Sequence, residues 1–255
     1  MELKVLGCSG GIGGLDQRTT SLRVDRDILI DCGTGAGILS VDELVGIDHV
    51  FLTHAHLDHI ALLPLLVDTV GDLRERPITL YATDATLKLI RSHIFNWLIW
   101  PDFTAIPDRV NPYLRMQPLR VGEAVELGGR RITAIPALHS VPAVGYWLQA
   151  EGGSLVFSGD TTISESMIEA VNRIHDLRYL LIETAFSNSQ QDLAMAARHL
   201  CPSMLHRLLD RLTGDPEVYV THLKPGFVER TAEEVLAYTG RLRPRILAND
   251  QVFRI

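Results

Sequence analysis

Apolar residues along the chain form two kinds of pattern. Short aliphatic and β-branched runs bounded by Gly, Pro, Asn or Asp are typical of strands, and apolar residues recurring every three or four positions are typical of helices. The expected helices are Ile60–Val70, Ala85–Phe95 and Ala232–Leu242, and residues 96–113 read as irregular. The expected strands are Leu3–Leu6, Leu22–Val24, Ile28–Ile30, His49–Thr53, Ile78–Tyr81, Arg131–Ile135, Gly145–Leu148, Ser154–Phe157, Tyr179–Ile182, Glu217–Val220, Arg245–Leu247 and Val252–Ile255.

The order of these elements predicts a layered α/β protein with two sheets, because strands dominate first and then alternate with helices. No repeat, low-complexity stretch or linker interrupts the chain, so we expect a single domain over residues 1–255. Loops at strand ends converge on one edge of a sheet scaffold, and polar side chains there should gather. The polar residues that follow the end of an apolar strand are His54, His139, Asp160, Glu183 and His222.

Three histidines and one aspartate lie within six residues, from His54 to His59. Imidazole and carboxylate groups together suit Zn, Fe or Mn. His54 and His56 alternate and can face one metal, whereas Asp58 and His59, on the first turn of the next helix, can face a second. Each metal needs about four ligands, one position being left for water. The candidates that would complete the two sites are His139, Asp160 and His222.

Composition narrows the possible partners. The net charge is −7 and there is no long basic run, which argues against a large nucleic-acid footprint and favours a small substrate. Cys8, Cys32 and Cys201 match neither a metal pair nor a disulfide framework, so free thiols in a cytoplasmic setting are expected. The N-terminal apolar run is too short for a signal peptide. No segment reaches the roughly 18 to 20 apolar residues that span a bilayer, so no membrane association is expected.

A glycine cluster from Gly7 to Gly14 follows the first strand, as a dinucleotide-binding fingerprint would. The next segment leads into another strand, so the helix N-terminus that would hold a pyrophosphate is missing. We therefore expect no nucleotide cofactor. The remaining histidines are interpreted as structural; they are His49, His93, His175 and His206.

The run Thr53–His59, with His139, Asp160 in a Ser-Gly-Asp-Thr segment and His222 after a Thr, resembles the metallo-β-lactamase superfamily in its phosphodiesterase branch. The resemblance implies a four-layer αββα sandwich. It also implies that Asp31 orients a ligand imidazole. One implied metal site takes His54, His56 and His139, the other takes Asp58, His59 and His222, and Asp160 bridges both.

Further segments are similar to the class II cyclic-nucleotide phosphodiesterases: His56–Ile60, His93–Asn96, Trp100–Phe103, Ile182–Asn188, His199–Pro202 and Thr221–Pro225. The resemblance implies hydrolysis of 3′,5′-cyclic AMP or GMP to nucleoside monophosphates by a hydroxide between two divalent ions. Zinc is the first expectation for both ions, with iron or manganese as alternatives. The chain departs from the family pattern at Leu62, where a small residue is usual, and at Cys201, where threonine is usual.

Asp58, His199 and Glu183 are the candidate catalytic residues. The spacing of Glu183 and His199 resembles a carboxylate–histidine pair in tRNA 3′-end processing endonucleases, which implies that Glu183 orients His199 as a general acid or a transition-state hydrogen-bond donor. The alternative is that His199 only caps a helix. Trp100 and Phe103, with Asn96, are either part of a lid over the base or core and dimer-contact residues, and a homodimer is expected. No role is predicted for Asn188.

Other functions remain open at this point. An endonuclease of the tRNA-processing type would share the metal set, but it would carry a Gly/Pro-rich arm and a basic surface, and neither is evident. A hydrolase of another small phosphodiester, a lactone or a thioester would fit the same fold. A degenerate, non-enzymatic metal-binding protein would have lost ligands, whereas every matched ligand position is filled.

Overall fold

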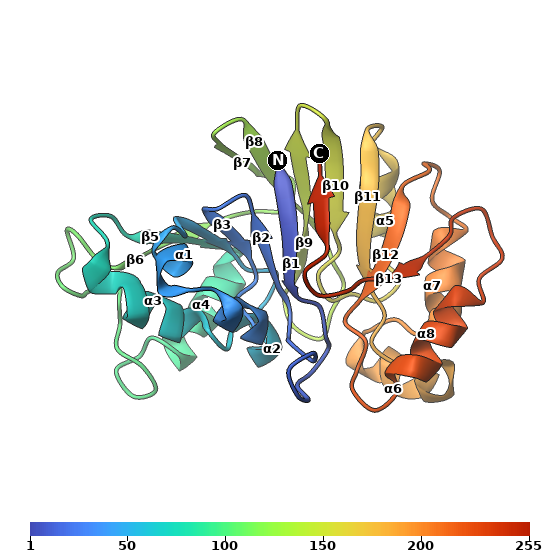
Figure 1. The fold of residues 1–255 in the computed structure, drawn as a ribbon, viewed down its shortest axis with the longest axis horizontal. Coiled ribbons are helices and arrows are strands. Elements are labelled where there is room, and N and C mark those ends of the chain that lie inside the picture. The colour runs from blue at the N-terminus through green and yellow to red at the C-terminus, as the bar shows by residue number, and fades with distance from the viewer.

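The computed structural model describes all 255 residues and contains two seven-stranded sheets that pack face to face, with helices on their outer sides (Figure 1). Strands β3 to β6 of the first sheet run parallel, and β14, β1, β2 and β3 pair antiparallel. In spatial order this sheet contains β14 (Val252–Arg254), β1 (Glu2–Gly7), β2 (Ser21–Val24), β3 (Ile28–Ile30), β4 (His49–Phe51), β5 (Ile78–Ala82) and β6 (Leu114–Pro118).

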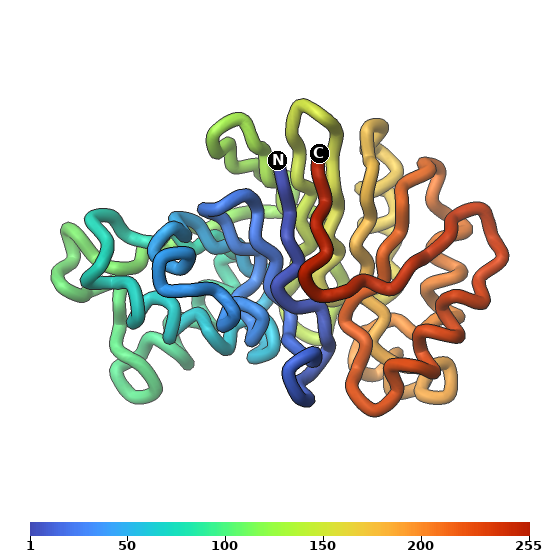
Figure 2. The backbone as a smooth tube through the Cα atoms, in the orientation of Figure 1, coloured from blue at the N-terminus to red at the C-terminus, as the bar shows by residue number.

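The second sheet has the same mixture, with β13 to β10 parallel and β10 to β7 antiparallel. Its spatial order is β13 (Arg245–Ile246), β12 (Glu217–Thr221), β11 (Leu177–Glu183), β10 (Gly153–Phe157), β9 (Val144–Ala150), β8 (Arg130–Pro136) and β7 (Ala124–Leu127). The two chain ends lie side by side at one edge of the first sheet, where the blue and red ends of the tube run together and β1 pairs with β14 (Figure 2).

Helices from the two halves of the chain cover opposite outer faces (Figure 1). The first group is α1 (Val41–Val45), α2 (Leu57–Ile60), α3 (Leu63–Val70) and α4 (Asp84–His93), with 3-10 turns η1 (Thr34–Ile38) and η2 (Gly71–Leu73). The second group is α5 (Glu165–Asn172), α6 (Gln191–Ala197), α7 (Pro202–Leu209) and α8 (Val228–Leu236), with the turn η3 (Asn188–Gln190). The αββα arrangement confirms the predicted fold class. No helix in the structure has the length and apolar character needed to cross a membrane.

Alternation along each central strand explains why there are three apolar layers. In β4, Phe51 packs between the sheets whereas Val50 packs against the first helix group. In β10, Leu155 packs between the sheets and Val156 against the second helix group. Successive side chains of a strand point to opposite faces, so a strand that is apolar throughout is one that is covered on both faces.

Two expectations about helices were wrong, and some elements were not predicted. The predicted helix Ile60–Val70 is two helices, because the Leu62 amide bonds to the Cys32 carbonyl and Pro64 starts a new first turn. The last helix ends at Leu236 rather than Leu242. Helix α5, capped by Ser164, and the edge strands β6 and β7 were not predicted.

Candidate metal centre

The polar strand ends predicted to gather do so at one edge of the sandwich. His54 follows β4, and Asp58 and His59 lie on α2, whose N-cap is His56. Asp160 follows β10 and lies at the middle of the group. The loops after β8 and β12 bring in His139 and His222. Both halves of the chain therefore contribute to one centre.

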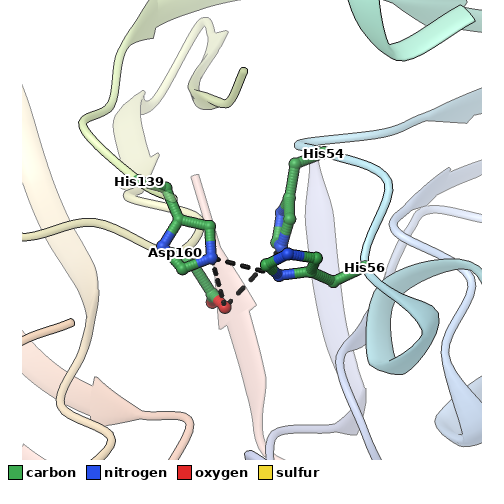
Figure 3. Close-up of side chains that lie close together, drawn as sticks. All are labelled: His54, His56, His139 and Asp160. Atoms are coloured by element: carbon green, nitrogen blue, oxygen red, sulfur yellow. Dashed lines mark hydrogen bonds and ion pairs between the residues drawn. The ribbon is translucent and has the colours of Figure 1, made fainter. Parts of the chain in front are cut away.

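One cluster of potential ligand atoms consists of His54, His56, His139 and Asp160, whose side chains converge from the two halves of the chain (Figure 3). His56 Nδ1 and His139 Nε2 are 3.1 Å apart. Asp160 Oδ2 lies 3.7 Å from His54 Nε2 and 3.9 Å from His139 Nε2. One atom from each of the four residues lies within 4.8 Å of the others, close enough to surround one ion.

A second cluster consists of Asp58, His59, His222 and again Asp160. His59 Nε2 lies 3.3 Å from Asp160 Oδ1, and His222 Nε2 lies 3.3 Å from Asp160 Oδ2. Asp58 Oδ2 is 3.6 Å from His222 Nε2. Asp160 faces both clusters, which is the arrangement needed for a carboxylate that bridges two ions.

Hydrogen bonds behind the centre fix which nitrogen faces it. The Thr53 hydroxyl donates to Asp31 Oδ2 at 2.8 Å, so its oxygen accepts from the Nδ1–H of His54 at 3.0 Å. The Nδ1–H of His59 donates to Asp31 Oδ2 at 2.7 Å, and that of His139 donates to a backbone carbonyl at 3.1 Å. In the neutral form of each ring the proton lies on Nδ1, and Nε2 presents a lone pair to the centre.

The atoms that face the centre have no hydrogen-bond partner in the protein, although they are buried. These atoms are His54 Nε2, His59 Nε2, His222 Nε2 and Asp160 Oδ1. An unsatisfied buried polar atom costs about 1–3 kcal/mol, so four in one place call for an explanation. Divalent cations would satisfy all four, because imidazole nitrogen and carboxylate oxygen are the donors that Zn, Fe and Mn accept. The donor set therefore fits two such ions.

Burial keeps several of the imidazoles neutral, the form in which histidine binds metal. It lowers the pKa of His54 well below the ordinary value, with the neighbouring His59 adding to the effect. It also lowers the pKa of His139 to about 4 and that of His222 to about 3. These three side chains are therefore ready to act as ligands without first losing a proton at neutral pH.

His59 differs because two carboxylates flank it. Burial alone would lower its pKa, but Asp160 and Asp31 together raise the pKa well above the ordinary value. Burial would raise the pKa of Asp160, yet the surrounding histidines, His222 and His59 above all, hold it well below its usual range. Asp160 thus remains a carboxylate at the point where the two clusters meet.

Two glycines, Gly159 and Gly10, allow backbone segments to pack closely around the centre. Gly159 has φ 58°, and a Cβ there would lie 2.7 Å from the Val144 carbonyl oxygen, so only glycine allows the turn that presents Asp160. A Cβ on Gly10 would lie 2.3 Å from the His222 carbonyl oxygen. The glycine cluster after β1 therefore packs against the turn that carries His222.

Glu183 ends β11 and accepts four hydrogen bonds in a fully buried position. Its Oε1 accepts from Thr161 N at 3.0 Å and from the Nδ1–H of His199 at 2.7 Å. Its Oε2 accepts from the amides of Ala185 and Leu200 at 3.1 and 3.3 Å. The predicted Glu183–His199 pair is thus formed, and the carboxylate fixes the plane of the imidazole.

The Glu183–His199 pair borders the two clusters of potential ligand atoms. The His199 ring lies 4.8 Å from the His139 ring and is stacked 5.4 Å from the His222 ring. Burial raises the pKa of Glu183, and His199 partly opposes this. Burial would lower the pKa of His199, but the Glu183 carboxylate raises it above the ordinary value. His59 and His199 are therefore the two imidazoles at this edge that are favoured in their protonated form.

The lid interpretation for Asn96, Trp100 and Phe103 finds no support. Phe103 is only 4% exposed and packs in the apolar layer under α3 and α4, with Trp100 against the same layer. Asn96 accepts from the amides of the two residues after Trp97, which shapes a turn. Asn188 has a similar local role, because its side chain accepts from the Ser203 amide at the start of α7.

A family model described as "Beta-lactamase superfamily domain" matches residues 26–223, which include every residue of both clusters. The chain belongs to the beta-lactamase superfamily. This match, together with the two donor clusters, confirms the prediction of a metal-dependent hydrolase of that superfamily.

Two curated relatives and one solved structure show the range of the superfamily around this chain. A probable 3′,5′-cyclic-nucleotide phosphodiesterase of Yersinia pestis is 28% identical over 207 residues, covering 71% of this chain and 58% of the relative. A ribonuclease Z of Haloarcula marismortui is 25% identical over an alignment of 318 residues, covering 100% and 96%. Unliganded yeast PDE1 superposes with a TM-score of 0.81 at 20% identity, covering 98% of each chain, which shows the shared fold.

The chain spans about half the length of several curated relatives that it matches, with 58%, 49% and 46% in three of them. These relatives carry two different activity names, cyclic-nucleotide phosphodiesterase and ribonuclease Z. The superfamily and its metallohydrolase class are therefore established by the comparisons, and the substrate is a separate question.

Three residues at the centre were missed by sequence reasoning. The Thr53 hydroxyl donates to Asp31 and accepts from His54. The Arg198 carbonyl accepts from His139, and Lys224 lies beside Asp58. Each of them lies within two residues of a predicted ligand or catalytic residue, and this closeness in sequence is the signal that could have indicated them. Their contacts depend on tertiary structure and could not be derived from spacing.

Proposed function

We propose that this chain is a two-metal phosphodiesterase that hydrolyses 3′,5′-cyclic nucleotides to nucleoside monophosphates. The observation that carries the proposal is the pair of donor clusters that share Asp160, each with one donor atom per residue within 4.8 Å of the others. Two-metal sites of this kind recur in enzymes that cleave phosphate esters by in-line displacement.

The proposed ligands follow the clusters. His54, His56 and His139 would hold one ion, Asp58, His59 and His222 would hold the other, and Asp160 would be shared between the two sites. Zinc is the proposed ion at both positions, with iron or manganese as alternatives for the same donors. Bound there, the ions would supply Lewis acidity that activates water and offsets the negative charge on the phosphoryl oxygens.

The chain's own contribution to bond cleavage is assigned to His199. Its Nδ1–H is held by Glu183, so the second ring nitrogen, Nε2, is the one that carries the transferable proton. Glu183 stabilises the protonated ring and keeps it oriented. His199 then donates the Nε2 proton to the oxygen that leaves phosphorus, which prevents a costly alkoxide from departing.

A small phosphodiester is favoured over tRNA because the chain carries a net charge of −7. Binding of a long nucleic acid depends on many phosphate contacts from Lys and Arg. The tRNA-processing activity is the second candidate, since relatives named ribonuclease Z match the chain.

A panel assay on the metal-loaded protein separates these candidates. The panel contains cyclic AMP, cyclic GMP, 2′,3′-cyclic nucleotides, bis-p-nitrophenyl phosphate and a precursor tRNA. The proposal expects turnover of a cyclic nucleotide. Activity on the precursor tRNA alone would contradict it in favour of the second candidate.

We also propose that the protein is cytoplasmic and that it forms a homodimer. A cytoplasmic setting is supported by three free thiols, two of them on the buried Cys32 and Cys201. A homodimer is supported by an exposed apolar tip in which Trp97, Leu98 and Ile99 are 62%, 88% and 66% exposed. Sedimentation of a monomer at micromolar concentration would contradict the dimer.

A further inference from the structure

Lys224 places a positive charge at the edge of the centre. It lies two residues after His222, in the turn that follows β12. Its Nζ is 4.0 Å from Asp58 Oδ2, and its side chain is 32% exposed. The ammonium group therefore borders one donor cluster and is also open to solvent, so a bound molecule can reach it.

The turn that carries Lys224 is held from two sides. The Lys224 amide donates to the Ala185 carbonyl at 3.0 Å, and the Gly10 amide donates to the Leu223 carbonyl at 3.1 Å. A Cβ on Gly11 would lie 2.9 Å from the Pro225 ring, so the glycine segment packs closely against the turn. The base of the lysine side chain is thus fixed relative to the centre.

The charge around Lys224 changes when Asp58 acts as a ligand. Asp58 is the one carboxylate within ion-pair distance of Lys224. A divalent ion held by Asp58 would be the largest local charge at this carboxylate and would compete with Lys224 for it. Lys224 would then be less closely paired than a surface cation such as Lys4, which pairs with Asp250.

Lys224 and the proposed proton donor border the same donor cluster. His222, two residues before Lys224, has its ring stacked 5.4 Å from the His199 ring, and its Nε2 lies 3.6 Å from the Asp58 oxygen that Lys224 approaches. A phosphoryl group bound between this cluster and His199 would therefore lie near the lysine.

We propose that Lys224 is the residue that selects an anionic substrate, by binding a non-bridging phosphoryl oxygen of the diester so that the centre discriminates against neutral esters. The inference rests on the proposed phosphodiesterase function and names the group that recognises the charge of its substrate. Lysine suits this role as a compact charge with three rotatable donors.

Charge selectivity gives the first test. The variants Lys224→Met and Lys224→Arg are compared with Lys88→Met, a matched control at an exposed position on α4. The substrates are bis-p-nitrophenyl phosphate, a monoanion, and diethyl p-nitrophenyl phosphate, a neutral triester. Lys224→Met should raise KM for the diester about 10- to 100-fold, the effect of losing one charge-assisted hydrogen bond. KM for the neutral ester should rise much less than KM for the diester, Lys224→Arg should recover part of the loss, and Lys88→Met should match the wild type.

Binding of inorganic phosphate gives a second test that does not depend on turnover. Calorimetry on the metal-loaded proteins should show weaker phosphate binding by Lys224→Met than by the wild type and Lys88→Met. Failure of the wild type to hydrolyse any diester would contradict the proposed function, and the phosphate measurement would still decide the role of Lys224. Equal phosphate affinity in all three proteins, or no measurable binding by the wild type, overturns the inference. Loss of bound metal from Lys224→Met overturns it too, since Lys224 would then act by supporting Asp58.

Discussion

The substitution Asp31→Asn tests whether a carboxylate behind the centre sets the form of a metal ligand. Asp31 is fully buried and accepts from the Thr53 amide, the Thr53 hydroxyl and the Nδ1–H of His59, at 2.8, 2.8 and 2.7 Å. Asparagine has nearly the same shape, and its oxygen can still accept from the Thr53 amide. Its NH2 group, however, would meet the two donors that now bond to Oδ2.

The easiest relief for this donor–donor conflict is a change of tautomer at His59. If His59 accepts at Nδ1, its proton moves to Nε2, and the lone pair that faces Asp160 is lost. Loss of such a supporting partner typically weakens metal affinity about 10- to 100-fold. The lost charge-assisted bonds should also lower the stability of the apo protein by about 1–3 kcal/mol.

Two measurements on Asp31→Asn check this reasoning. Calorimetric titration of the apo protein with zinc should show the larger loss of affinity at the site of His59, which bonds to Asp31 directly, and a smaller loss at the site of His54, which Asp31 reaches only through the Thr53 hydroxyl. Urea unfolding of the apo protein should show the loss of stability. Asp42→Asn, at an exposed position on α1, is the control. Wild-type affinity at both sites in Asp31→Asn would refute the tautomer argument.

Three further predictions concern separate parts of the structure. His199→Ala should retain its metal and lose about 100- to 10,000-fold in kcat; full activity with full metal content would end the proton-donor role. Gly10→Ala should weaken zinc binding, because the new Cβ would lie 2.3 Å from the His222 carbonyl oxygen and push that ligand aside; calorimetry measures the change, and unaltered affinity speaks against it. Arg130→Ala should cost about 1–3 kcal/mol in urea unfolding, because the side chain makes two hydrogen bonds to Asp27 across the two sheets. The bond to Arg130 lowers the pKa of Asp27, so this contribution is present above the unfolded-state pKa and is lost as the pH falls through the folded-state value; a cost that persists unchanged in acid would contradict the ion-pair origin.

The ligand positions could be predicted from the sequence because two physical signals coincide there. Apolar runs such as those before His54 and Asp160 must form buried strands, and a polar residue directly after such a run lies at the sheet edge. A dense His/Asp run then indicates metal chemistry without any knowledge of tertiary contacts. The αββα layering follows from the same strands, since their apolar residues alternate between two cores.

The missed elements lack these signals. The edge strand β6 carries Arg115 and Gln117 and is largely exposed, so its pattern resembles a polar loop. The break at Leu62 depends on a hydrogen bond to Cys32, which lies far away in sequence. The hydrogen bonds that connect Asp31 to His59, and through Thr53 to His54, likewise form only after folding. Local patterns report burial, whereas partners between distant segments are determined by packing.

The central claim is that two ions share Asp160. Inductively coupled plasma mass spectrometry on apo protein reconstituted with excess zinc and then desalted measures the number of bound ions directly. The account predicts two zinc ions per chain, and a value near one in Asp160→Asn, where the shared carboxylate is replaced. One ion or fewer in the wild type after reconstitution would contradict the two-metal centre and the mechanism built on it.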